Sequence, residues 1–357
     1  MTLLDPRSIR RLAAELGLRP SKQRGQNFVH DANTVRRIVA AAGVAPGQVV
    51  LEVGPGLGSL TLGLLEAGAE VVAVEIEPCL ARRLPRTVAE LMPEAGRRLH
   101  VVEGDALKLA PAGESPEAAS PGADAQGRGR PDGNPELVDV GAGPADEARE
   151  AATPARGGQA AWPLPELLVA NLPYNVSVPV ILHLLEKFDT IQGGLVMVQS
   201  EVADRLVAGP GSKVYGAPSA KLAWYADATR VGGVPPTVFW PAPNVDSGLV
   251  SFRRHPEGLS GGSQSGDSRV AGRGGEDSAG EGGSLGNGAA APARERVFAV
   301  VDAAFGQRRK MLRQALSGLF GSSSAAAEAL AGAGVDPQAR GERLSIADFA
   351  RVAARLP

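Results

Sequence analysis

Residues 52–58 read Glu-Val-Gly-Pro-Gly-Leu-Gly, and this stretch decides the fold because it joins an apolar run to a helical pattern. The run Val49–Val53 is typical of a buried strand, and residues 59–67 have the spacing of a helix. The glycines between them permit a tight turn and let a ligand approach the N–H groups that begin the helix. This order fits a dinucleotide site, an S-adenosylmethionine site or a purely structural turn.

The positions of three acids favour S-adenosylmethionine. Glu52 precedes the first glycine inside the strand, which gives Glu-x-Gly-x-Gly-x-Gly and not the dinucleotide spacing. Glu75 ends the next apolar run, where a carboxylate can accept hydrogen bonds from both ribose hydroxyls. Asp105 follows the third run and is placed to accept from an adenine amine. Taken singly, Glu75 and Asp105 also fit a solvated side chain or a helix cap.

Outward from this loop, strand-like runs alternate with helical patterns, and this order predicts a mostly parallel, doubly wound, Rossmann-like α/β sheet. The further runs are Val71–Ile76, Leu99–Val102, Leu167–Ala170 and Leu195–Val198, and the further helical patterns cover 32–42, 78–91, 178–188 and 200–207.

Near the end of the sheet the order changes. Ala228–Val231 and Gly248–Arg253 are separated by a Pro-rich segment and not by a helix, which predicts an antiparallel hairpin at the edge of a seven-stranded sheet. Only helical patterns follow, at about 293–319, 323–332 and 345–355. They predict a small all-helical C-terminal domain.

Composition limits the class of protein. With 357 residues, of which 43% are hydrophobic and 21% charged, the chain can bury a sizeable core. The single cysteine, Cys79, excludes a disulfide framework and a cysteine-rich zinc site, and we expect no metal. The first residues lack a signal-peptide pattern, and no apolar run approaches the ~18 residues of a membrane span. We therefore expect a soluble cytoplasmic protein.

The net charge of −2 conceals a basic folded part. Residues 111–160 and 258–290 are rich in Gly, Ala, Pro and Ser and contain no aromatic residue, so we expect two disordered inserts. The first holds nine acids and four bases and the second four acids and two bases, which leaves the remainder with an excess of five bases. Bases cluster within 7–24 and 308–313, as in a phosphate-binding surface or an ordinary solvated face.

A second motif, Asn171-Leu-Pro-Tyr174, closes the apolar run that begins at Leu167. At the carboxyl edge of a parallel sheet, the Asn171 side-chain oxygen and the Leu172 or Pro173 carbonyl can accept from an exocyclic amine. Tyr174 can stack on a base taken out of its helix. An ordinary turn also fits the tetrapeptide. Its place after the part of the chain that carries the predicted cofactor site favours methyl transfer to adenine.

Six segments, taken together and in order, resemble the bacterial 16S rRNA adenine N6-dimethyltransferase family (KsgA/RsmA). The resemblance covers nearly the whole chain except the two inserts; the glycine loop is shared by many methyltransferases, whereas the order of all six is specific. The segments are Gln26-Asn-Phe-Val29, Leu51-Glu-Val-Gly-Pro-Gly-Leu-Gly58, Asn171-Leu-Pro-Tyr-Asn175, Ser212-Lys-Val-Tyr-Gly216, Val234-Pro-Pro-x-x-Phe239 with Pro241-x-Pro-x-Val-Asp-Ser247, and Phe305-x-Gln-Arg-Arg-Lys310.

The resemblance implies a class I methyltransferase that uses S-adenosyl-L-methionine to dimethylate N6 of two adjacent adenosines near the 3′ end of 16S rRNA. The substrate would be the immature 30S subunit, during ribosome biogenesis, and we expect a monomer. Phe239 is a candidate to stack on the target base, although core packing also fits it. The implied cofactor contacts are Asn27, Val29, Gly54, Glu75, Asp105 and Asn171, and Asn171, Leu172, Pro173 and Tyr174 would hold the target adenine.

The expected domains are a basic N-terminal segment at 1–30 that contributes to the cofactor site, a methyltransferase domain at 31–257, a linker at 258–290 and an rRNA-binding helical domain at 291–357. The inserts depart from the family pattern, which has much shorter connections there. Three alternatives remain: a 23S rRNA adenine methyltransferase of the macrolide-resistance type, a DNA adenine methyltransferase, and a non-catalytic ribosome assembly factor. The Ser-Lys-Val-Tyr-Gly and Gln-Arg-Arg-Lys segments favour the 16S rRNA enzyme over the 23S type. A DNA enzyme usually carries Asp or Asn followed by Pro-Pro-Tyr, and intact Glu75, Asp105 and Asn171 argue against a loss of catalysis.

Overall fold

A computed structural model describes residues 3–18, 27–111, 162–256 and 292–357 of the chain. The two predicted inserts lie outside the described residues, apart from Pro111. So do Gln26 and part of the N-terminal basic cluster, namely Arg19, Lys22 and Arg24.

The described residues form the predicted seven-stranded sheet, in the order β4-β3-β2-β5-β6-β9-β7. Its first five strands run parallel, and β9 runs antiparallel to both β6 and β7, so β9 is an inner strand and β7 is the edge. The strands are β2 (Val49–Val53), β3 (Glu70–Glu75), β4 (Leu99–Glu103), β5 (Leu167–Asn171), β6 (Gly193–Gln199), β7 (Ala226–Val234) and β9 (Ser247–Arg254).

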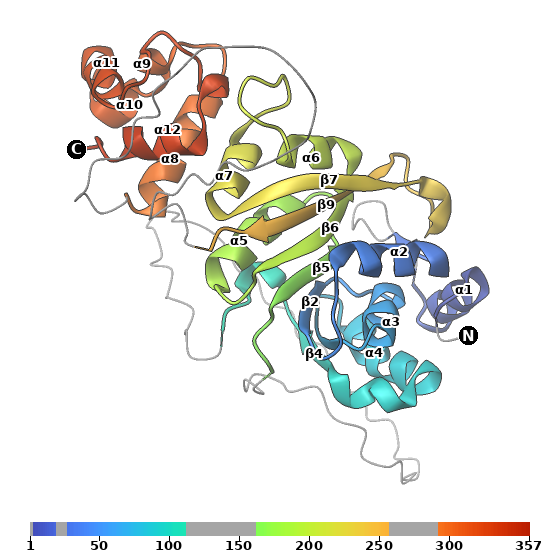
Figure 1. The fold of residues 1–357 in the computed structure, drawn as a ribbon. Coiled ribbons are helices and arrows are strands. Elements are labelled where there is room, and N and C mark those ends of the chain that lie inside the picture. Colours follow the sequence, from blue (N-terminus) through green and yellow to red (C-terminus); the bar gives the residue numbers. More distant parts are fainter. Residues whose placement is uncertain (1–2, 19–26, 112–161, 257–291) are drawn as a thin grey trace, which may run out of the picture.

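The inner strands alternate between two apolar layers, as a sheet covered on both faces requires. In β6, Leu195 and Met197 face one layer of helices, and Val196 and Val198 face the other. The first layer contains α1 (Pro6–Glu15), α2 (Ala32–Ala42), α3 (Ser59–Glu66) and α4 (Pro78–Leu91). The second contains α5 (Ser177–Lys187), α6 (Ser200–Leu206) and α7 (Ala217–Tyr225). Figure 1 shows both layers around the sheet.

A two-stranded ribbon ties the N-terminal part to the Pro-rich segment. Strand β1 (Phe28–Val29) pairs antiparallel with β8 (Phe239–Trp240), and Val29 lies opposite Phe239. After β1, the Asp31 carboxylate accepts from the Thr34 N–H at 2.6 Å and begins α2, as its N-cap residue type favours. The ribbon thus carries the segment before Asp31 across to the edge where the parallel strands end.

The C-terminal helices pack around a core of their own (Figure 1, orange to red). Tyr215 and Ala220, from the stretch before β7, belong to the same core, and the Tyr215 hydroxyl donates to the Leu344 carbonyl at 2.8 Å. The helices are α8 (Arg294–Gly306), α9 (Leu312–Ala315), α10 (Ser317–Phe320), α11 (Ser323–Gly332) and α12 (Ile346–Ala353), so the single helix predicted over 293–319 is wrong in its length. Nowhere in the described ranges is a helix both long and apolar enough to cross a membrane.

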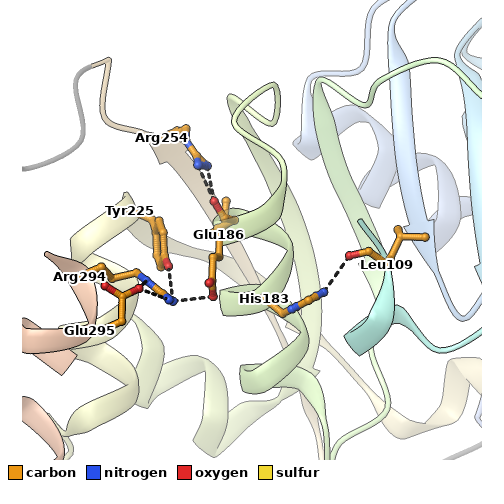
Figure 2. A network of polar contacts seen from close by, with 8 residues as sticks. Leu109, His183, Glu186, Tyr225, Arg254, Arg294 and Glu295 are labelled. Carbon is orange, nitrogen blue, oxygen red and sulfur yellow. Dashed lines mark hydrogen bonds and ion pairs between the residues drawn. The ribbon is translucent and has the colours of Figure 1, made fainter. Parts of the chain in front are cut away.

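Helix α5, which follows the Asn-Leu-Pro-Tyr segment, connects the two parts of the molecule (Figure 2). Its Glu186 accepts from Arg294, the first residue of α8, at 2.5 Å, and Arg294 also reaches the Tyr225 hydroxyl at 3.3 Å. On the other side, His183 Nε2 donates to the Leu109 carbonyl at 2.9 Å. The helical C-terminal part is therefore fixed on the second layer of the sheet.

Candidate active site

A cavity of about 550 Å³ lies at the carboxyl ends of the parallel strands, where β2, β3 and β5 end side by side. It brings together every residue predicted to contact the cofactor, and Pro173 of the second motif. These residues are Asn27, Val29, Gly54, Glu75, Asp105, Asn171 and Pro173. Phe28, which lies between Asn27 and Val29 in the chain, lines the cavity as well.

The glycine loop shapes one wall of the cavity. Gly54 and Gly56 have φ values of +69° and +59°, which favour glycine. A Cβ at Gly56 would lie 2.8 Å from the Phe28 ring, so the loop and β1 approach each other as closely as glycine allows. The Ser59 hydroxyl, at the first position of α3, is buried and has no hydrogen-bond partner among the described residues.

Glu75 is held in the cavity by backbone donors. Its two oxygens accept from the Gly56 N–H at 3.1 Å and the Glu77 N–H at 3.0 Å, and its exposed fraction is 4%. Burial raises the pKa of this carboxyl above its usual value, and the two backbone N–H groups oppose the rise. Each oxygen has a further lone pair, so a ribose diol can still donate to both.

Asp105 caps the short helix at Ala106–Lys108 with one carboxylate oxygen, which accepts from the Leu107 N–H at 3.0 Å. Two apolar side chains that the sequence did not predict also line this end of the cavity. Ile76 is 63% exposed and Leu107 is 37% exposed. Exposed aliphatic groups beside an acceptor suit a flat, apolar ring that carries an amine.

Asn171, the last residue of β5, is oriented from the N-terminal segment. Its Nδ2 donates to the Asn27 carbonyl at 3.2 Å, which leaves Oδ1 as the acceptor on the other side of the amide group. Leu172 is buried, and its N–H donates to the Met197 carbonyl of β6 at 3.1 Å. The backbone of the motif is therefore fixed by the neighbouring strand, and the side-chain oxygen of Asn171 by Asn27.

Comparison with known proteins shows the family to which the chain belongs. The family model for ribosomal RNA adenine dimethylase matches residues 18–264. A ribosomal RNA small subunit methyltransferase A from Cutibacterium acnes is 53% identical, over 99% of this chain and 94% of that protein. One from Thermobifida fusca is 49% identical, over 99% and 96%. The chain belongs to the ribosomal RNA adenine dimethylase family.

Two solved structures share the fold. A dimethyladenosine transferase from Plasmodium falciparum has a TM-score of 0.59 at 18% identity, over 91% of this chain and 95% of that one. The 23S rRNA methyltransferase ErmE has a TM-score of 0.52 at 21% identity, over 92% and 99%. Both confirm the Rossmann-like methyltransferase fold. As a member of the dimethylase family, the chain is an enzyme that uses S-adenosylmethionine to dimethylate adenine in ribosomal RNA.

The residues of this dimethylase fit the cofactor that the family implies. The cavity offers a buried acid for a diol and an exposed pair of aliphatic side chains with an acceptor for an adenine. It also offers the buried Ser59 hydroxyl, which no described residue bonds, for a charged or polar tail. Behind the loop, Glu52 is 1% exposed and accepts from the Thr61 hydroxyl at 2.6 Å. Burial raises the pKa of Glu52 to about 8.

Three predicted substrate residues lie outside the lining of this cavity, namely the buried Leu172, Tyr174 and Phe239. Tyr174 is half-buried, and its hydroxyl lies 3.1 Å from the Ser247 hydroxyl of β9. Phe239, the first residue of β8, is 3% exposed and packs in the core. The structure thus places Phe239 in the core and not at the cavity, so stacking on a base would require its side chain to move.

Proposed function

We propose that this enzyme transfers two methyl groups to the N6 amine of each of two adjacent adenosines near the 3′ end of 16S rRNA, in the immature 30S subunit during ribosome biogenesis. The orientation of Asn171 carries the proposal. Because Asn27 takes the amide N–H, the side chain presents an acceptor beside the cavity, which suits a substrate with an exocyclic amine. Relatives at about half identity bear the name ribosomal RNA small subunit methyltransferase A, which favours the small subunit over the 23S alternative.

The residues of the chain act on the amine by orienting it. The N6 lone pair of adenine is delocalised into the ring, and acceptors on the two N6 hydrogens favour the pyramidal nitrogen that a methyl transfer needs. Asn171 Oδ1 and the carbonyl of Leu172 or Pro173 would supply these acceptors, with Pro173 fixing the backbone. Because the methylated ammonium product is acidic, it can lose its proton to solvent without a strong general base. Tyr174 would stack on the extruded base.

When bound, S-adenosylmethionine supplies an electrophilic methyl group on sulfur. Glu75 would hold the ribose of this molecule, Asp105 would accept from its adenine amine, and Gly54, Asn27 and Val29 would contact it through the backbone. The closeness of Asn27 to Asn171 couples the two halves of the site. The same contact that orients the acceptor for the target base also shapes the wall of the cofactor cavity.

Contact with rRNA beyond the pocket would come from basic residues of the N-terminal segment and of the helices in 291–357. Arg309 and Lys310 are exposed in the turn between α8 and α9, Arg313 is exposed on α9, and the basic excess outside the inserts suits a phosphate-rich partner. We expect the enzyme to act as a monomer in the cytoplasm, where subunits assemble, and without a membrane partner.

Methyl transfer to small subunits tests this function. Purified protein and labelled S-adenosylmethionine are incubated with immature 30S subunits, unmodified 50S subunits and duplex DNA, and the labelled nucleotides are mapped. We expect N6,N6-dimethyladenosine at two adjacent positions near the 3′ end of 16S rRNA. Label on 23S rRNA alone, on DNA alone, or on no nucleic acid would instead support one of the three alternatives.

A further inference from the structure

The Pro241–Ser247 segment, which is part of the family resemblance, contacts the Asn-Leu-Pro-Tyr motif through its last residue. Its last residue, Ser247, is 1% exposed, and its hydroxyl lies 3.1 Å from the Tyr174 hydroxyl. The two residues are 73 positions apart in the chain. This contact joins the base-binding motif after β5 to the first residue of β9.

Ser247 is a rigid anchor because the sheet holds it from both sides. It pairs with Gln199 of β6 and with Val234 of β7, and the preceding carbonyl, of Asp246, accepts from the Ser200 N–H at 3.0 Å. Strand β6 lies between β5 and β9, so the Tyr174 side chain crosses the carboxyl end of β6 to reach Ser247. The ring is thereby fixed at both ends, through its backbone after Pro173 and through its hydroxyl.

The chemistry of a double methylation gives this anchor a use. An unmodified N6 amine has two hydrogens and can donate to both acceptors of the motif. In each transfer the N6 lone pair forms the N–CH₃ bond, the sulfur–carbon bond breaks with its electron pair on sulfur, and N6 releases one proton to solvent. After the first transfer N6 has one hydrogen left, so one of the two hydrogen bonds that orient the base is lost.

We infer that Ser247 is a positioning residue for the second methyl transfer: by anchoring Tyr174, it keeps the singly methylated adenine stacked in place when only one amine hydrogen bond remains. The inference rests on the proposed function and deepens it. The Tyr174 hydroxyl is then an anchor and not a catalytic group. Loss of the anchor affects the second transfer more than the first, because the first is oriented by two hydrogen bonds as well as by the ring.

The product ratio tests this role. Wild type, Ser247→Ala, Tyr174→Phe and the double variant are compared in single turnovers on immature 30S subunits, and N6-monomethyl and N6,N6-dimethyladenosine are quantified by mass spectrometry. Either single variant should raise the monomethyl-to-dimethyl ratio about 2- to 12-fold, the range expected for one neutral hydrogen bond. The double variant should raise it no further, since both changes remove the same contact.

The controls separate this role from a merely structural one. Ser251→Ala, four residues along β9, should leave the ratio at the wild-type value. Calorimetric affinity for S-adenosylmethionine should be unchanged in all variants, which shows that they are folded. Dimethylation by wild type with unchanged ratios in Ser247→Ala and Tyr174→Phe would overturn this inference alone. A wild-type protein that leaves 30S subunits unmethylated would overturn the proposed function, and the inference with it.

Discussion

The two polar atoms of the Asn171 amide group have different roles. The nitrogen donates to the Asn27 carbonyl, and the oxygen is the acceptor assigned to the substrate. Asn171→Ala removes an acceptor that acts mainly while N6 becomes pyramidal, so turnover should fall about 100-fold, as for other lost transition-state hydrogen bonds. The cofactor dissociation constant should change far less. Single-turnover methylation and calorimetry measure the two quantities, and equal losses in both would contradict this assignment.

Substitution of Glu75 should weaken cofactor binding more than it lowers turnover. Glu75→Ala removes the acceptor proposed for the ribose, and the cofactor dissociation constant should rise roughly 10- to 100-fold, as for a hydrogen bond to a charged group. Glu103→Ala is a matched control, because Glu103 lies opposite Glu75 on the neighbouring strand β4 and is exposed. Calorimetry on both variants decides the question: an unchanged constant for Glu75→Ala removes Glu75 from the ribose site.

Glu52 should make the stability of the protein depend on pH. Its folded pKa is raised from 4.5 to about 8, so between these values the folded state holds a proton that the unfolded chain has lost. The free energy of unfolding should therefore fall as pH rises through this window, by about 1.4 kcal/mol per pH unit for one proton. Urea unfolding between about pH 5 and 8 should show a shallower fall for Glu52→Gln. Equal slopes would mean that Glu52 is ionised in the fold.

The candidate site was predictable where a residue type and a strand end coincide. Glu75, Asp105 and Asn171 each close a strand or follow one, and the parallel order brings such positions to one edge. Ile76 and Leu107 were missed, although Ile76 directly follows Glu75 and Leu107 follows Asp105 by two positions, and apolar residues so near a predicted acid at this edge indicate a ring-binding wall. The burial of Phe239 depends on the β1–β8 pairing, which no local pattern reveals.

Among the elements, the loop between α6 and α7 is held against the C-terminal part by Arg308, a residue of the basic run. Arg308 donates to the Lys213 carbonyl at 2.7 Å and to the Glu342 carboxylate at 3.1 Å, whereas Arg309 and Lys310 are exposed. Glu342 holds the same loop through its own carbonyl, which accepts from the Gly211 N–H at 2.7 Å. Arg308 is therefore structural, although it lies in a run that reads as phosphate-binding.

Substitutions in the basic run should have two different effects, on stability at Arg308 and on binding to 30S subunits at Arg309 and Lys310. Arg308→Ala should lower Tm by about 2–4 °C, the shift expected for a loss near 1 kcal/mol in a domain of this size. Arg309→Ala and Lys310→Ala should leave Tm unchanged and weaken binding to 30S subunits, with a reduced dependence on salt. Thermal unfolding and binding at several salt concentrations measure both effects. A wild-type Tm for Arg308→Ala would show that the loop does not depend on this contact.

Element boundaries were predictable where local chemistry sets them and failed where distant contacts do. Asp31 begins α2 as its residue type predicts. The helical spacing of 293–319 continues past Gly306, but the chain leaves the helix there and α9 begins only at Leu312, whose N–H donates to the Ala339 carbonyl. Helix α7 was missed, although Pro218 near its start and Ser219, which accepts from the Gly216 N–H, are helix-start signals.

At the scale of the whole molecule, α5 and the residue that follows it anchor both ends of the segment 112–161. On one side His183 donates to the Leu109 carbonyl at 2.9 Å, and on the other the Trp162 ring packs against Phe188 at a centroid distance of 5.9 Å. Glu186 on the same helix holds Arg294 of the C-terminal part (Figure 2). The two ends of the segment and the junction with the C-terminal helices are thus fixed by contacts among described residues.

Residues 113–160 should therefore be dispensable for folding and for methylation. A variant in which a short Gly-Ser linker replaces them should methylate immature 30S subunits at a rate within about two-fold of wild type, since the described residues alone bring together every predicted cofactor contact. Its Tm should not fall, because a shorter connection costs less closure entropy. Thermal unfolding and single-turnover methylation measure both. A variant with 113–160 scrambled separates length from sequence: loss of methylation in both variants would show that this sequence contributes to substrate recognition, because the site and its anchors are unchanged in each.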